Sequence, residues 1–83
     1  MVLYYLKANE NSLGVVASKK VGNAVLRNRA KRLLRATFRE YDLPLGNGSY
    51  VLVAKAAIFN LSYESLQEEL ATALKRAGAI VKS

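Results

Sequence analysis

Eight of the chain's thirteen Lys and Arg residues fall between Lys19 and Glu40, and Glu40 is the only acid in that segment. Arg presents a planar fork of N–H donors that matches a phosphate group, and Lys adds a compact point charge. The chemistry available here is therefore the binding of a polyanion. The segment reads as a single helix: at the helical period Leu26, Ala30 and Leu34 share one arc, and cations cover the opposite side.

A solvated helix face is the alternative explanation for this basic run. Such a face usually mixes charges, because opposite charges four residues apart attract each other; no acid occurs between Lys19 and Arg39. The predicted helix start is Gly22 followed by Asn23 as N-cap. Cations just after it lie at the positive end of the helix dipole, which costs about a few tenths of a kcal/mol each. A bound phosphate reverses that sign, so nucleic-acid contact is the preferred interpretation.

A second predicted helix carries its charges differently. It begins at Ser62, a residue that caps helices, and ends before Gly78. Glu64 lies in its first turn and Lys75 and Arg76 in its last turn, as the dipole prefers. Its apolar stripe comprises Leu66, Leu70, Ala73, Leu74 and Ala77.

Three strands are predicted from β-branched, aromatic and aliphatic residues. The ranges 2–8 and 13–19 flank a polar turn at 9–12, which favours an antiparallel hairpin. A third strand spans 50–55, after a loop rich in Pro, Gly and Asn at 42–49. Alternation leaves open which side of each strand faces the helices.

Composition excludes several classes of function. The 83-residue chain allows one small domain, and its net charge of +7 favours nucleic acid or an anionic surface. It has no Cys and no His, which removes disulfides, His-based metal sites and Ser-His or Cys-His nucleophiles. The six acids form no motif of a metal-dependent nuclease. No apolar run approaches the ~20 residues that span a bilayer, and the start lacks the pattern of a signal peptide, so a cytoplasmic location is expected.

The run SKKVGNAVLRNRAKRLLRATFRE resembles the signature of the protein subunit of bacterial ribonuclease P. The paired lysines, the Gly-Asn turn, the Arg-Asn-Arg core at 27–29, Lys31-Arg32 and Arg35 carry the resemblance. It implies an RNA-binding subunit that assists a catalytic RNA in removing the 5′ leader from precursor tRNA. The chain would then be an enzyme only as part of the holoenzyme, with no catalytic or metal-binding residue of its own, and Mg²⁺ would act through the RNA subunit. The alternative is a stand-alone basic RNA-binding module, such as a small ribosomal or RNA-chaperone-like protein.

The resemblance also implies a fold. We expect an α+β two-layer sandwich, with a three-stranded mixed sheet packed on two helices in the order β-β-α-β-α. The strand-helix-strand crossover would be left-handed, against the general rule for parallel neighbours. The chain is expected to be a single ribonuclease P protein-like domain, 1–83, that lacks the helix and strand with which family members usually begin. A sheet without that strand has an unpaired edge, which makes self-association an alternative to a monomer.

The resemblance places the RNA contacts on the basic helix and on the turn before it. The tyrosines of the strands are candidates for stacking on unpaired bases of the leader, and packing within the domain is the alternative for them. The expected partners are ribonuclease P RNA and precursor tRNA, with no membrane. The predicted RNA contacts are Lys19, Lys20, Asn23, Arg27, Asn28, Arg29, Lys31, Arg32 and Arg35, and the candidate leader contacts are Tyr4, Tyr5 and Tyr50.

Overall fold

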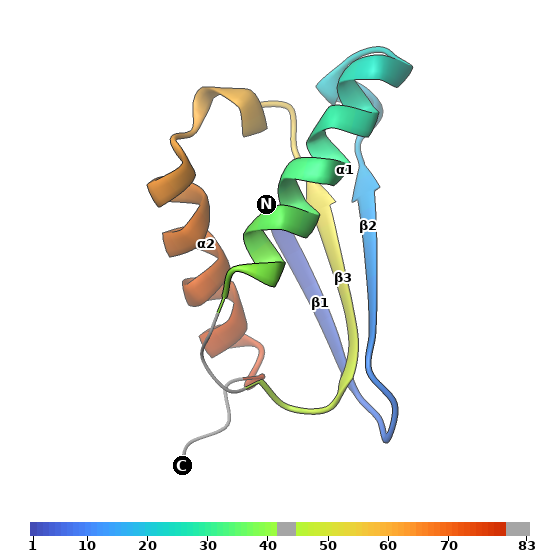
Figure 1. Cartoon of the computed structure of the whole chain (residues 1–83), viewed down its shortest axis with the longest axis vertical. Coiled ribbons are helices and arrows are strands. Elements are labelled where there is room, and N and C mark those ends of the chain that lie inside the picture. Colours follow the sequence, from blue (N-terminus) through green and yellow to red (C-terminus); the bar gives the residue numbers. More distant parts are fainter. Residues whose placement is uncertain (42–44, 80–83) are drawn as a thin grey trace.

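The structure, a computed structural model, describes residues 1–41 and 45–79. It has the predicted α+β architecture and the predicted order of strands and helices (Figure 1). The predicted loop at 42–49 lies partly outside the described residues. The elements are β1 (Val2–Lys7), β2 (Ser12–Ala17), a 3-10 turn η1 (Lys19–Val21), α1 (Ala24–Arg39), β3 (Gly48–Ala54), a 3-10 turn η2 (Ile58–Asn60) and α2 (Tyr63–Arg76).

The three strands form one mixed sheet in the order β1-β3-β2. β3 pairs antiparallel with β1 and parallel with β2, so the predicted antiparallel hairpin between the first two strands is wrong. The turn between β1 and β2 instead holds the start of β3, because the Gly48 N–H donates to Asn11 Oδ1 at 3.0 Å. Buried and half-buried residues alternate along β3. Because β3 lies between β1 and β2, the backbone groups on both of its edges are hydrogen-bonded.

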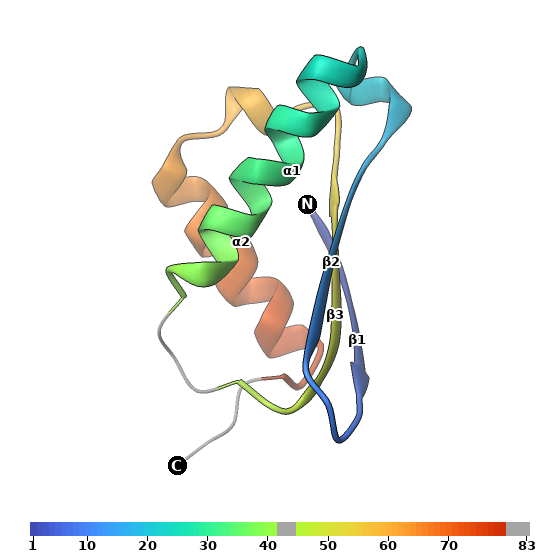
Figure 2. The same cartoon turned by 45° about the vertical axis from the view of Figure 1, so that its right-hand side comes forward.

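The connection from β2 through α1 to β3 is a left-handed crossover, as the resemblance implies. In Figure 1 both parallel strands run upward and α1 crosses in front of the sheet, while the chain moves from β2 on the right to β3 on its left. Figure 2 shows α1 and α2 on the same side of the sheet. The opposite face of the sheet is not covered by either helix.

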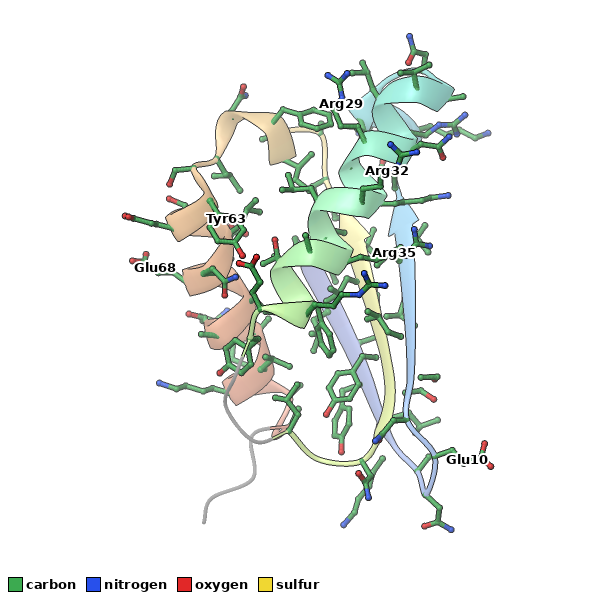
Figure 3. The ribbon with its side chains drawn as sticks, in the orientation of Figure 1. Glu10, Arg29, Arg32, Arg35, Tyr63 and Glu68 are labelled. Atoms are coloured by element: carbon green, nitrogen blue, oxygen red, sulfur yellow. The ribbon has the colours of Figure 1, made fainter. Side chains whose placement is uncertain are left out.

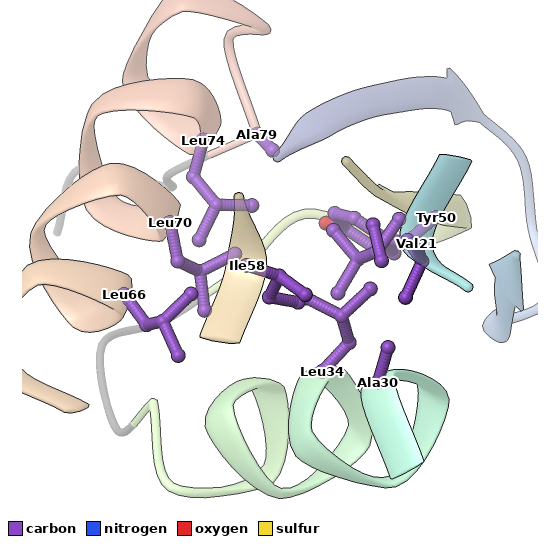
Figure 4. Close-up of a cluster of buried hydrophobic side chains, with 11 residues drawn as sticks. Val21, Ala30, Leu34, Tyr50, Ile58, Leu66, Leu70, Leu74 and Ala79 are labelled. Atoms are coloured by element: carbon purple, nitrogen blue, oxygen red, sulfur yellow. The ribbon is translucent and has the colours of Figure 1, made fainter. Parts of the chain in front are cut away.

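The core lies between this sheet face and the two helices (Figure 4). β3 contributes Leu52 and Ala54, and α1 contributes Leu34, each with no exposed surface. The register places Leu3 and Val15 beside Leu52, which settles the strand faces that alternation left open. From α2 the core receives Leu66, Leu70 and Leu74.

The basic run is not the single helix that its composition predicts. Gly22 separates η1 from α1 with a φ of 143°, a backbone conformation that favours glycine. A Cβ at this position would meet Leu26 Cδ1 at 2.5 Å. The chain therefore turns at Gly22 before α1 begins, and the predicted start at Asn23 is confirmed.

Candidate nucleic-acid interface

α1 presents its cations because its N-cap and its apolar stripe fix the rotation of the helix. Asn23 Oδ1 accepts a hydrogen bond from the Leu26 N–H at 3.0 Å, which satisfies one of the free donors of the first turn. Ala30, Leu34 and Thr37 are buried against the sheet and α2. The buried Thr37 hydroxyl donates to the Leu33 carbonyl oxygen at 2.8 Å, so burial leaves it satisfied.

Most of the predicted RNA contacts lie on the surface that this rotation turns away from the core. In Figure 3 Arg29, Arg32 and Arg35 project from α1, whereas the labelled acids lie elsewhere: Glu68 on α2 and Glu10 in the turn between β1 and β2. Two of the predicted contacts, Arg27 and Lys31, are half-buried rather than fully exposed. The exposed ones are Lys19, Lys20, Asn23, Asn28, Arg29, Arg32 and Arg35.

The cations of α1 have no acidic partners among the residues that the structure describes. The salt bridge within that part of the chain joins the N-terminal amine to Glu69 Oε1 at 2.8 Å, and it involves no residue of α1. The first turn of α1 contains no acid either. The positive charge of this surface is therefore uncompensated within the described residues. We call the surface the α1 cationic face and define it by Arg27, Arg29, Lys31, Arg32 and Arg35.

Two of the three candidate leader contacts pack inside the domain. Tyr50 is buried, and its hydroxyl donates to the Gly46 carbonyl oxygen. Burial, followed by the neighbouring Tyr5, raises the pKa of the Tyr50 phenol. The Tyr5 ring lies 4.8 Å from the Tyr50 ring between centroids, and its hydroxyl donates to the Asn47 carbonyl oxygen at 2.9 Å. These contacts occupy both rings, and stacking on a base would compete with them.

Tyr4 has a different location, on the uncovered face of the sheet, where it is 62% exposed. Leu6 and Val16 on the same face are 71% and 48% exposed. The register places Val51 beside Tyr4 and Gly14. An uncovered apolar face of the sheet was expected, but sequence reasoning could not say which residues form it, because both sets of alternating residues in these strands are apolar and neither set is marked as the solvent side.

Residues 1–41 and 45–79 contain neither a metal-binding cluster of side chains nor a membrane-spanning helix. No group of three or more His, Cys, Asp or Glu side chains there has the arrangement needed to hold a metal ion. None of the described helices has both the length and the apolar character needed to cross a membrane.

Comparison with known proteins relates this geometry to one family. The family model described as Ribonuclease P matches residues 1–78. The Ribonuclease P protein component of Nitratiruptor sp. is 44% identical over 75 residues, which cover 90% of this chain and 69% of that protein. The corresponding protein of Syntrophomonas wolfei is 37% identical over 86 residues, which cover 100% of this chain and 72% of that protein.

Solved structures agree with the sequence matches. The RNase P protein of Staphylococcus aureus superimposes with a TM-score of 0.75 at 28% identity, over 95% of this chain and 75% of that one. The RNase P protein of Thermotoga maritima has the same fold, with a TM-score of 0.73 at 24% identity, over 98% of this chain and 76% of that one.

Proposed function

This chain belongs to the ribonuclease P protein family, and from that premise we propose that the α1 cationic face and the turn before it bind the ribonuclease P RNA. As a member of that family the chain is an RNA-binding subunit of the tRNA-processing holoenzyme. A stand-alone ribosomal or chaperone-like module is not favoured. What the proposal adds is the surface that makes the contact and the role of each residue on it.

The uncompensated charge of α1 carries this proposal. Like charges three or four residues apart on a helix repel, and a folded domain gains nothing from leaving them unrelieved. An RNA backbone relieves this repulsion, because each phosphate accepts a charge-assisted hydrogen bond from an Arg fork. Arg27, Arg29, Arg32 and Arg35 are suited to bidentate phosphate contacts. Lys19, Lys20 and Lys31 add charge, and Asn23 and Asn28 offer amide groups to phosphate or 2′-hydroxyl oxygens.

In this proposal the phosphodiester chemistry belongs to the RNA subunit. Mg²⁺ held by that RNA supplies the activation of water and the stabilisation of the leaving oxygen. The described residues offer no cluster of ligands for such an ion. The chain contributes binding free energy, neutralises phosphate repulsion and positions the substrate, in the cytoplasm where bacterial tRNA precursors are processed.

For precursor tRNA, the proposed contact is the uncovered face of the sheet. The Tyr4 ring and the exposed Leu6 and Val16 side chains provide an apolar surface on which unpaired leader bases would stack. Tyr4 is the preferred stacking residue of the three tyrosines, since Tyr5 and Tyr50 pack on each other. Replacing Tyr4 with Leu should weaken photocrosslinking to a leader, whereas unchanged crosslinking would exclude the contact.

Self-association is proposed through the outer edge of β1. Within the described part of the chain β1 pairs only with β3, so its other edge presents unpaired backbone groups. A second copy of the chain pairing there would give a dimer at high concentration. Sedimentation velocity over a range of concentrations tests this, and a single monomer peak throughout would contradict it.

The central experiment is reconstitution with a bacterial ribonuclease P RNA at low Mg²⁺. The chain should restore cleavage of a precursor tRNA at its 5′ end, because the α1 cationic face replaces part of the cation requirement of the RNA. Binding should weaken with salt, with a log-log slope of about −0.7 to −0.9 per phosphate contacted. A nearly flat slope would exclude α1 as the main contact, and cleavage by the chain alone would overturn the assignment of the chemistry to RNA.

A further inference from the structure

A groove is lined by residues of β2 and of the first half of α1. Its volume is about 280 Å³. Small-molecule sites usually span about 300–1,000 Å³, so this groove has room for about one small unit, such as a phosphate with its sugar, and not for a duplex. It is lined by Val15, Val16, Ala17, Ala24, Arg27, Asn28 and Lys31.

The groove holds the two cations of α1 that differ from the others in burial. Arg27 and Lys31 are half-buried, whereas Arg29, Arg32 and Arg35 are exposed. Arg27 and Lys31 are four residues apart, so they are neighbours on one side of the helix and repel each other. Neither pairs with an acid among the described residues. An anion bound between these two partly desolvated cations would gain more electrostatic binding free energy than an anion on the open face, because water screens the charges less there.

The other wall and the floor suit the remainder of a nucleotide. β2 is an edge strand in the described sheet, so its outer side carries unpaired backbone donors and acceptors. Val15, Val16, Ala17 and Ala24 are the apolar lining residues, and we call them the floor of the groove. Asn28 offers both an amide donor and a carbonyl acceptor beside the two cations. A sugar seated on this floor would have its hydroxyl groups within the polar rim.

We propose that the β2–α1 groove binds one ribonucleotide of a single RNA strand, with its phosphate between Arg27 and Lys31 and its 2′-hydroxyl bonded to Asn28. This inference rests on the proposed function and gives the residues of the Arg-Asn-Arg core two different roles. Arg27 and Asn28 bind the phosphate and the sugar in the groove, and the bond to the 2′-hydroxyl distinguishes RNA from DNA. Arg29, with Arg32 and Arg35, holds RNA through charge and does not distinguish the two.

The discriminating experiment compares a single-stranded RNA oligonucleotide with the DNA of the same sequence by fluorescence anisotropy. The full chain should bind the RNA about threefold to tenfold more tightly, the value of one net hydrogen bond. Asn28→Ala should lower RNA affinity to the level of DNA and leave DNA affinity unchanged. Arg32→Ala should weaken both ligands by the same factor. Equal binding of RNA and DNA by the unmodified chain, or an equal loss on both in Asn28→Ala, would overturn the proposal.

The location is tested by titrating the isotope-labelled chain with adenosine 5′-monophosphate, its 2′-deoxy counterpart and inorganic phosphate. The amide signals of Val15, Val16 and Ala17 should move most with the ribonucleotide, and Lys31→Gln should abolish these shifts. Arg39→Gln, which removes an exposed cation outside the groove, should retain them. Equal shifts from inorganic phosphate would overturn the role of the sugar, and shifts centred on Asn23 would overturn the site.

The outcome is separable from that of the proposed function. If the chain restores cleavage by the ribonuclease P RNA but shows neither sugar discrimination nor shifts in β2, this inference alone fails. If the shifts and the discrimination are present but the chain does not stimulate cleavage by the RNA, the proposed function fails, whereas nucleotide binding in the groove is still supported.

Discussion

The two helices bury similar faces and carry opposite arrangements of charge. α1 and α2 have 16 and 14 residues, and both place leucines with almost no exposure in the shared core. α2 has Glu64 in its first turn and Lys75 and Arg76 in its last turn, the distribution that its dipole favours. α1 has no acid in its first turn and cations along its whole outer side. The charges of α2 are therefore placed where they stabilise the helix, whereas those of α1 are not, which is the arrangement that the proposed RNA interface requires.

Removal of positive charge from α1 should cause the largest loss of affinity for ribonuclease P RNA. The triple variant Arg29→Gln, Arg32→Gln and Arg35→Gln should lose about 4 kcal/mol of binding free energy, roughly a thousandfold in affinity for ribonuclease P RNA. The slope of log K against log salt should become shallower by about three, one for each lost phosphate contact. Filter binding over a range of salt concentrations measures both quantities.

A control with the same change in net charge isolates the effect of location. Lys7→Gln, Lys75→Gln and Arg76→Gln remove three exposed cations outside α1. This variant should bind nearly as tightly as the unmodified chain, yet lose about 0.3–1 kcal/mol of stability from the last turn of α2. Equal losses of affinity in the two triple variants would mean that net charge alone, and not the α1 cationic face, holds the RNA.

The core anchors of the two helices should be equivalent despite this difference in charge. Leu34 of α1 and Leu70 of α2 both have 0% exposed surface. Leu34→Ala and Leu70→Ala should each lower the free energy of unfolding by about 2–5 kcal/mol, because each leaves a cavity in a small core. Urea denaturation measures this loss. A cost below about 1 kcal/mol for Leu34→Ala would show that α1 is held less firmly than its burial indicates.

The N-caps offer a finer comparison. Asn23 Oδ1 accepts from the Leu26 N–H, and Ser62 Oγ accepts from the Ser65 N–H at 3.1 Å. Asn23→Ala and Ser62→Ala should each cost about 1 kcal/mol of stability, measured by thermal unfolding. Only Asn23→Ala should also weaken binding to ribonuclease P RNA, since Asn23 belongs to the proposed interface and Ser62 does not. Parallel effects of the two variants on RNA affinity would remove Asn23 from the interface.

The sequence predicted the two helices well because N-caps, apolar stripes and terminal charges all lie within or next to the helix that they indicate. The cap at Ser62, the stripe of leucines and the charges of α2 lie within a few turns of one another, and α2 follows them. For α1 the cap at Asn23 was correct, but the residues before it were assigned to the same helix. Gly22 is where the prediction of one continuous helix fails, because a φ of 143° depends on how the chain leaves β2.

Strand pairing was the part that sequence could not determine. β1 and β2 are close in sequence, which favours a hairpin, but β3 lies between them. That choice depends on contacts across about half of the chain, and no local signal reports it. The same holds for the candidate site. The cationic helix face was predicted from residue spacing, and its RNA contacts from the family resemblance. The burial of Tyr50 and the groove beside Arg27 depend instead on where β3 and β2 lie relative to α1.

The smallest expected effect concerns a contact that joins the two helices. The hydroxyl of Tyr63, in the first turn of α2, donates to the Glu40 carboxylate at the end of α1, and this bond is the main reason why the pKa of Tyr63 is raised above its usual 10.0. Gln67 Nε2 donates to the same hydroxyl at 2.8 Å and to the Thr37 carbonyl oxygen at 3.2 Å. The Gln67 contact with the Tyr63 hydroxyl lowers that pKa and so acts against Glu40.

A raised pKa in the folded state means that the Tyr63–Glu40 bond stabilises the fold fully below the pKa of an unfolded tyrosine. This stabilisation is lost as pH rises through the higher folded value. In Glu40→Gln the pKa of Tyr63, followed by NMR of its ring signals, should fall toward 10.0, and the stability of this variant should depend less on pH above that value. RNA affinity should stay unchanged, since this contact lies between the helices and away from the α1 cationic face. An unmoved pKa in Glu40→Gln would show that Glu40 does not hold the Tyr63 hydroxyl in solution.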